Sequence, residues 1–155
     1  MKVLVISDSH GFTRNVIAAL EKEPEINTVF FLGDGLSDID SCKEKYPEKQ
    51  FVCVRGNNDL FFDTDVTAYK YIDGNTVVLT HGHKYAVRET LFELFKHAES
   101  VRANVVLYGH THKSCNYYDP YFKIYAINPG AMCDGRYAVV SFEKSGVEAQ
   151  LKSIF

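Results

Sequence analysis

Short apolar runs alternate with polar loops and amphipathic stretches along the first third of the chain. Three runs rich in β-branched and large apolar residues are typical of strands buried on both faces, at residues 2–6, 28–32 and 51–54. Residues 13–23 and 37–46 have helical periodicity, and Thr13 is in a position to cap the first of these helices. Strand, loop and helix follow in order, which favours an α/β sheet with mixed pairing.

The second half of the chain is richer in strands. Residues 66–72 and 76–79 flank Asp73-Gly74-Asn75, a hairpin signal, and the apolar spacing of residues 87–97 predicts a helix. The remaining predicted strands are residues 105–108, 115–118, 122–127, 136–142 and 147–154. We therefore expect an α/β fold with two packed β-sheets and helices outside them, forming a single domain over residues 1–155.

Five of the predicted strands end in a polar cluster. The clusters are Asp8-Ser9-His10, Gly33-Asp34, Gly56-Asn57, His81 and His110-Thr111-His112. Strand ends on one edge of an α/β sheet are where such folds place their sites, so these clusters can meet. In an extended segment, residues i and i+2 point to the same face, so His110 and His112 can converge on one point or on two neighbouring points.

The clustered side chains have the chemistry of a metal site. Carboxylate, asparagine carbonyl and imidazole form a mixed oxygen and nitrogen set that suits Mn, Fe, Ni, Zn or Mg and needs no thiolate. The candidate ligands are Asp8, His10, Asp34, Asn57, His81, His110 and His112. Seven ligands are too many for one ion. If one carboxylate bridges, they divide between two ions about 3.5–4 Å apart, the spacing of two-metal phosphoryl-transfer sites.

Each of these residues also has an ordinary structural interpretation. Asp8 and Asp34 could be capping or turn residues, the glycines could be turn glycines, and a lone histidine such as His81 is more often a loop residue than a ligand. Together, these interpretations leave unexplained why four of only six histidines fall at strand-end glycines. The joint pattern favours the metal site.

Composition narrows the class of protein. The length of 155 residues and the hydrophobic content of 46% fit one domain with a sizeable core. A net charge of −3 argues against broad electrostatic binding of nucleic acid, and the longest N-terminal apolar run is far too short for a membrane span. Four cysteines without a Cys-x-x-Cys pair indicate small buried apolar residues in a reducing, cytoplasmic protein. With 10 Tyr and 11 Phe, the composition is also compatible with a homo-oligomer whose subunit interface is aromatic.

The order of the motifs resembles a known family, the calcineurin-like metallophosphoesterases, and within it the small single-domain bacterial and archaeal phosphodiesterases. The resemblance rests on Asp8-Ser9-His10, Gly33-Asp34, Gly56-Asn57-Asn58-Asp59, His81-Gly82-His83 and Gly109-His110-Thr111-His112. It implies a four-layer αββα sandwich of two mixed β-sheets flanked by helices, and a two-metal site. Asp8, His10 and His112 would hold the first ion. Asn57, His81 and His110 would hold the second, with Asp34 bridging the pair.

One motif departs from the pattern of the larger relatives. Many of them have a histidine after the motif's asparagine, whereas this chain has Asn58. A neutral amide can donate a hydrogen bond to a phosphate oxygen but cannot deliver a proton at neutral pH. Asn58 and Arg55 are therefore candidates to contact the phosphate. His83 is either a substrate contact or a turn residue.

The resemblance implies metal-dependent hydrolysis of a small phosphodiester by a hydroxide activated at a dinuclear centre. Asn58, Asp34 and His110 are the candidate catalytic residues, and two divalent ions are expected, manganese first, with Ni, Co, Fe, Mg or Zn as alternatives. A non-catalytic, metal-binding scaffold for protein interactions on the same fold, as in the retromer-subunit relatives, is the alternative. Neither a membrane nor a nucleic-acid partner is indicated.

Overall fold

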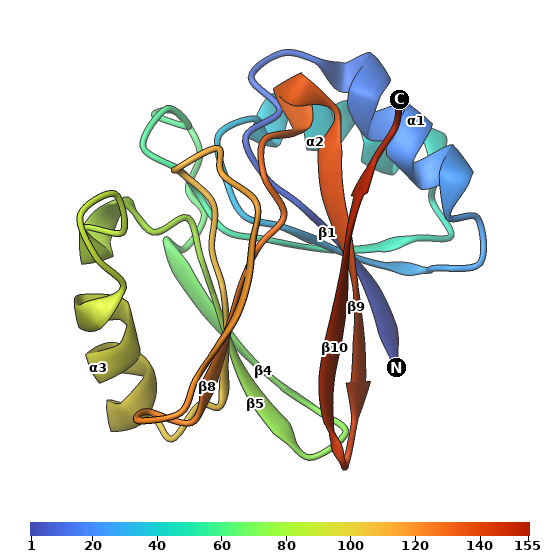
Figure 1. The fold of residues 1–155 in the computed structure, drawn as a ribbon. Coiled ribbons are helices and arrows are strands. Elements are labelled where there is room, and N and C mark those ends of the chain that lie inside the picture. Colours follow the sequence, from blue (N-terminus) through green and yellow to red (C-terminus); the bar gives the residue numbers. More distant parts are fainter.

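The computed structural model describes residues 1–155 and contains two five-stranded mixed sheets (Figure 1). The first sheet has the order β10 (Gly146–Ser153), β9 (Arg136–Glu143), β1 (Lys2–Ile6), β2 (Thr28–Phe31) and β3 (Gln50–Cys53). The second sheet has the order β4 (Thr67–Ile72), β5 (Asn75–Thr80), β6 (Val105–Leu107), β8 (Ile124–Asn128) and β7 (Cys115–Asp119). The three α-helices are α1 (Thr13–Lys22), α2 (Leu36–Lys45) and α3 (Phe92–Ser100), and two 3₁₀ turns are η1 (His83–Tyr85) and η2 (Met132–Asp134).

Three apolar clusters separate four layers. The central cluster lies between the sheets and joins residues such as Val5 of β1 to Leu79 of β5. A second cluster packs the first sheet against α1 and α2, and a third packs the second sheet against α3. Figure 1 shows α1 and α2 on the outer side of one sheet and α3 on the outer side of the other. The predicted αββα sandwich is confirmed.

Strand β1 shows how the sequence builds these layers. Alternate residues of a strand point to opposite faces of its sheet. Val3 and Val5 accordingly face the central cluster, and Leu4 and Ile6 face the cluster beneath α1 and α2. The strand pairs in parallel with β2 and antiparallel with β9, so it lies in the middle of the first sheet. Burial on both faces explains the continuous apolar run in the sequence.

Two local predictions were wrong. Thr13 makes no side-chain cap on α1; its hydroxyl donates instead to Asp38 Oδ1, at 2.6 Å. The helix predicted over residues 87–97 begins only at Phe92, since residues 86–89 form turns in which Glu89 and Thr90 donate to the carbonyl oxygen of Ala86. None of the helices is long and apolar enough to cross a membrane.

Candidate metal centre

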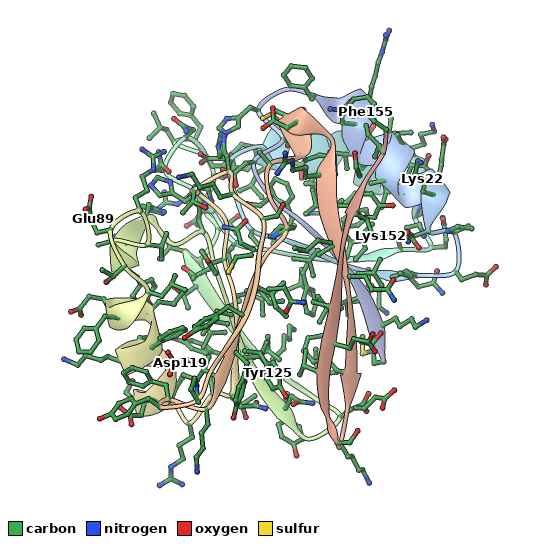
Figure 2. All side chains as sticks on the ribbon, in the orientation of Figure 1. Lys22, Glu89, Asp119, Tyr125, Lys152 and Phe155 are labelled. Carbon is green, nitrogen blue, oxygen red and sulfur yellow. The ribbon has the colours of Figure 1, made fainter.

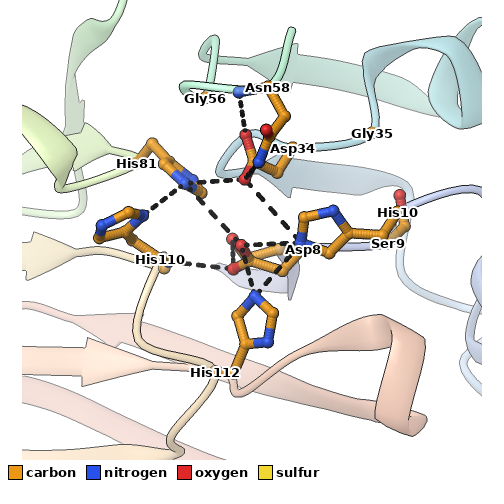
Figure 3. A network of polar contacts seen from close by, with 12 residues as sticks. Asp8, Ser9, His10, Asp34, Gly35, Gly56, Asn58, His81, His110 and His112 are labelled. Atoms are coloured by element: carbon orange, nitrogen blue, oxygen red, sulfur yellow. Dashed lines mark hydrogen bonds and ion pairs between the residues drawn. The ribbon is translucent and has the colours of Figure 1, made fainter.

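The predicted ligands lie on loops that follow the carboxyl ends of strands in both sheets. Asp8 and His10 follow β1, and Asp34 follows β2, in the first sheet. His81 follows β5, and His110 and His112 follow β6, in the second sheet. β1 and β2 run parallel to each other, as do β5 and β6, so each sheet brings its loops to one edge. Figure 3 shows these side chains pointing toward one another.

The backbone of these loops is unusual. Five of the six residues have left-handed φ values: Asp8 (56°), His10 (46°), Asp34 (61°), His110 (67°) and His112 (61°). A non-glycine residue in this region costs of the order of 1 kcal/mol or more, and such residues cluster at functional sites. The fold therefore holds these side chains in place against a local conformational preference.

Two motif glycines let the loops approach the carboxylates. A Cβ at Gly109 would overlap Ser7 Oγ and crowd Asp8 Oδ2, and a Cβ at Gly56 would overlap the carboxylate of Asp34. Only glycine allows the backbone to pass this close to a ligand. Gly56 and Gly109 are thus explained by the close packing of the backbone against the two carboxylates.

Asp8 lies at the centre of the cluster and is fully buried. Its Oδ2 accepts hydrogen bonds from Ser7 Oγ at 2.6 Å and from the backbone N–H of His110 at 3.0 Å. Its Oδ1 is buried and has no hydrogen-bond donor. Three Nε2 atoms surround this oxygen: that of His112 at 3.3 Å, His10 at 3.6 Å and His81 at 3.8 Å. A buried carboxylate oxygen without a donor and ringed by imidazole nitrogens fits a metal cation.

Asp34 is the second carboxylate of the cluster, and Asn58 holds both its oxygens. The backbone N–H of Asn58 donates to Oδ1 at 2.8 Å, and its Nδ2 donates to Oδ2 at 2.7 Å. Oδ2 also lies 3.3 Å from His81 Nε2 and 3.8 Å from His10 Nε2. Burial alone would raise the pKa of Asp34, but the contacts with His81 and Asn58 outweigh it and place the pKa far below its usual range. The side chain is therefore a carboxylate at neutral pH.

The buried imidazole of His81 is oriented from behind. Its Nδ1 donates to the carbonyl oxygen of Leu32 at 2.7 Å, which leaves Nε2 facing the two carboxylates. Burial opposes protonation, but Asp34 and Asp8 stabilise the charged ring, and the pKa of His81 is raised above its ordinary value. His110 lies beside it, with Nδ1 3.2 Å from His81 Nε2. Burial, with the charges of His81 and Arg88, lowers the pKa of His110 to about 4.

The donor atoms form two overlapping groups. Asp8, His10 and His112 form the first group, and Asp8, Asp34 and His81 the second, with the donor atoms in each group within 4.8 Å of one another. The two groups share Asp8. His110 joins the second group through its contact with His81. The structure thus brings six of the seven candidate ligands together.

The other candidate residues lie around this cluster. Asn57 is exposed, and its side chain makes no hydrogen bond, whereas Asn58 contacts Asp34. The ring centroid of His83 is 5.4 Å from that of His81, and its Nδ1 is buried without a hydrogen-bond partner. The Nε of Arg55 is also buried without a partner. Arg55 thus retains an unused donor, and the Nδ1 of His83 is a donor or an acceptor according to its tautomer.

Sequence reasoning did not identify two buried carboxylates that position the loops. Asp59 accepts backbone N–H bonds from four residues: Asp34, Gly35, Leu36 and Gly56. Asp38 accepts from Ser9 Oγ, Gly11 N and Thr13 Oγ1. Asp59 is part of the motif Gly56-Asn57-Asn58-Asp59, but no pattern in the sequence around Asp59 or Asp38 predicts this role.

Comparisons with known protein sequences point to one family. The sequence profile described as "Calcineurin-like phosphoesterase superfamily domain" matches residues 1–145. The probable metallophosphoesterase YsnB of Bacillus subtilis is 30% identical over 114 residues, which are 72% of this chain and 64% of that protein. A probable metallophosphoesterase of Mycoplasma pneumoniae is 30% identical over 136 residues, 84% of this chain and 79% of that protein. The chain thus spans a little under two thirds of the Bacillus protein.

Solved structures share the fold. A predicted phosphoesterase from Streptococcus pneumoniae has a TM-score of 0.81 at 24% identity, covering 99% of this chain and 89% of that one. A structure titled a novel archaeal phosphodiesterase has a TM-score of 0.73 at 24% identity, covering 98% of this chain and 100% of that one. Vps29 of Entamoeba histolytica, complexed with Zn²⁺, has a TM-score of 0.74 at 18% identity, covering 100% of each chain. At these identities the likeness establishes the fold alone.

Proposed function

Because the chain belongs to the calcineurin-like phosphoesterase superfamily, we propose that it is a metal-dependent phosphodiesterase that acts on a small phosphodiester at a dinuclear centre. The observation that carries the proposal is the buried Oδ1 of Asp8, which has no hydrogen-bond donor and is ringed by three imidazole nitrogens. A buried charge in this position needs a cationic partner.

The donor groups divide between two cations. Asp8, His10 and His112 would hold one ion, and Asp34, His81 and His110 would hold the other, with Asn57 reaching the second by a change of side-chain rotamer. When bound, two divalent cations lower the pKa of water and offset charge on the phosphate oxygens. The oxygen and nitrogen donors suit manganese first and Ni, Co, Fe, Mg or Zn as alternatives.

Asp34 is proposed as the carboxylate shared by both ions. Its Oδ2 lies 3.3 Å from Nε2 of His81 and 3.8 Å from Nε2 of His10, which belong to opposite groups. Asp8 Oδ1 also approaches ligands of both groups, so either carboxylate has the position of a bridge. Asn58 fixes the angle of Asp34 through two hydrogen bonds, and this contact supports a positioning role besides the proposed phosphate contact.

The remaining residues would receive the phosphate. Arg55 and His83 each have a buried nitrogen without a partner; a phosphate oxygen could accept from Arg55, and from His83 in the tautomer with its proton on Nδ1. No imidazole stands at position 58, so the chain itself offers no strong acid there for the departing oxygen. This supports diesters with acidic leaving groups as the preferred substrates. The structural neighbour titled a phosphodiesterase supports the same bond type.

The proposal is tested by turnover of bis-p-nitrophenyl phosphate with Mn²⁺, Ni²⁺, Co²⁺, Mg²⁺ or Zn²⁺ added to chelator-treated protein, with metal content measured on the same samples. We expect two ions per chain and metal-dependent release of nitrophenol. Asp34→Asn should abolish turnover, and Asp63→Asn, an exposed carboxylate on another loop, should not. Bound metal without turnover of any phosphoester would favour the interaction scaffold instead.

A further inference from the structure

We propose that a cavity beside His110 and His112 is an anion-binding subsite, which selects phosphodiesters that carry a second negatively charged group on one ester arm. This inference rests on the proposed function, because it assigns the substrate class of the same site.

The cavity adjoins the metal centre directly. It has a volume of about 530 Å³, within the range of pockets that hold small molecules. His110 and His112 form the wall that it shares with the candidate metal centre, and Val87, Leu91 and Tyr108 provide apolar surface. An ester arm of a phosphate held at these two histidines would therefore enter the cavity, where apolar atoms can pack against a ring.

Two cations of the cavity have no acidic partner. Arg88 and Lys113 line it, are exposed, and form no ion pair. The one hydrogen bond of the Arg88 side chain is a long contact, 3.5 Å, from Nη2 to the carbonyl oxygen of His110. This contact places the guanidinium next to the metal centre with most of its donors free.

The single acidic residue of the cavity does not cancel this charge. Glu89 is among the lining residues but pairs with neither cation, and Figure 2 shows it at the outer edge of the molecule. Two unpaired cations beside a site proposed to bind a phosphate favour an anionic group at a distance from the scissile bond. A phosphate or carboxylate on a nucleoside-sized arm has the chemistry to meet them.

The test uses a matched pair of chromogenic diesters. One is thymidine 5′-(p-nitrophenyl phosphate), and the other is the same ester with a 3′-phosphate. Hydrolysis consumes one water and releases nitrophenol from both, so the two probes differ only in the second anion. We expect a KM about tenfold lower for the 3′-phosphorylated ester, equivalent to about 1.4 kcal/mol, and a smaller preference at high salt.

Charge-removing variants assign this preference to the cavity. Arg88→Gln combined with Lys113→Gln should raise the KM of the 3′-phosphorylated ester to that of its partner, so that the ratio of the two KM values becomes about one. Arg88→Lys should retain part of the preference because it keeps the charge. Lys84→Gln removes an exposed cation that does not line the cavity and should change nothing.

A binding measurement separates this proposal from the phosphodiesterase proposal. Calorimetry with metal-loaded protein compares thymidine 3′,5′-bisphosphate with thymidine 5′-phosphate. Tighter binding of the bisphosphate that is lost in the double variant supports the subsite, even if no ester is hydrolysed. Equal binding of the two nucleotides, or a preference that survives in the double variant, overturns the subsite whether or not turnover is observed.

Discussion

Asp59→Asn should destabilise the protein and loosen its metal site, although Asp59 is not a candidate ligand. Asp59 is 5% exposed, and its carboxylate joins the loop after β2 to its own loop after β3. Oδ2 accepts from the backbone N–H groups of Asp34 at 2.7 Å and Gly56 at 2.9 Å, and Oδ1 accepts from Gly35 at 2.9 Å and Leu36 at 3.1 Å. It also caps α2, which has no side-chain cap at its own N-cap residue.

The magnitude follows from these four hydrogen bonds. Asparagine replaces one oxygen by an NH₂ group, so two backbone N–H donors face another donor instead of an acceptor. A hydrogen bond to a charged group contributes about 1.5–3 kcal/mol, so losing two lowers the free energy of unfolding by about 3–6 kcal/mol. Total stabilities of about 5–15 kcal/mol are usual, so the variant should fold with a much smaller margin.

The measurement is urea unfolding of the metal-free protein, followed by circular dichroism, together with calorimetric titration of Mn²⁺ into the folded variant. Asp63→Asn is the matched control, since it removes the same charge from an exposed residue four positions away that makes no hydrogen bond. We expect metal affinity to fall in Asp59→Asn, because Asp34 loses the contact that holds its left-handed backbone. An unfolding free energy within about 1 kcal/mol of the control, with unchanged metal affinity, would refute the reasoning.

Three further predictions concern the ligands and their neighbour. Asp34→Asn and His112→Ala should each lower diester turnover by orders of magnitude and leave the circular dichroism spectrum unchanged. Asp34→Asn should lower turnover more, and near-normal turnover in that variant would exclude a bridging role for Asp34. Metal binding at pH 7 should release protons, because the raised pKa of His81 keeps its ring partly protonated without metal, whereas His110, with a pKa of about 4, is already neutral. The apparent metal affinity should therefore rise with pH through neutrality, and activity should decline below about pH 6. Calorimetry of metal binding in buffers of different ionisation enthalpy measures the released protons. A binding heat that does not depend on the buffer would contradict the predicted proton release. Asn58→His should accelerate alkyl esters more than nitrophenyl diesters, since general acid catalysis contributes about 10²–10⁴-fold where the leaving group is poor; identical leaving-group slopes for the two proteins would show that position 58 does not address the departing oxygen.

The site could be anticipated from sequence because its signals are local. A ligand after a strand needs a loop that turns sharply, and Gly56 and Gly109 mark the places where the backbone passes against Asp34 and Asp8. Apolar periodicity predicts these loops at strand ends, where the site of an α/β fold is expected, but it does not show that the loops come from two sheets. The layered fold followed from the same runs of buried residues.

The supporting contacts could not be anticipated, because they join distant segments. Asp59 accepts from the backbone N–H of Asp34, 25 residues away, and any residue could supply that donor. Asp38 accepts from the hydroxyl of Ser9, 29 residues away, which no local pattern pairs with it. Thr13 has the composition of a helix cap, yet its hydroxyl is taken by Asp38. All four cysteines are free, but only Cys42 is buried, so their expected role as buried apolar residues holds at one position.

Strand β9 pairs with β1 in the first sheet but is synthesised long after it. All seven candidate ligands have been synthesised once residue 112 is reached. The loop of Asp8, however, is held from its far side by η2, where Met132 N–H donates to the Ser7 carbonyl at 2.8 Å and Cys133 N–H donates to the Asp8 carbonyl at 3.1 Å. Strand β9 then covers the open edge of β1. A nascent chain on the ribosome would thus carry every candidate ligand before the contacts from η2 and β9 that hold the Asp8 loop could form.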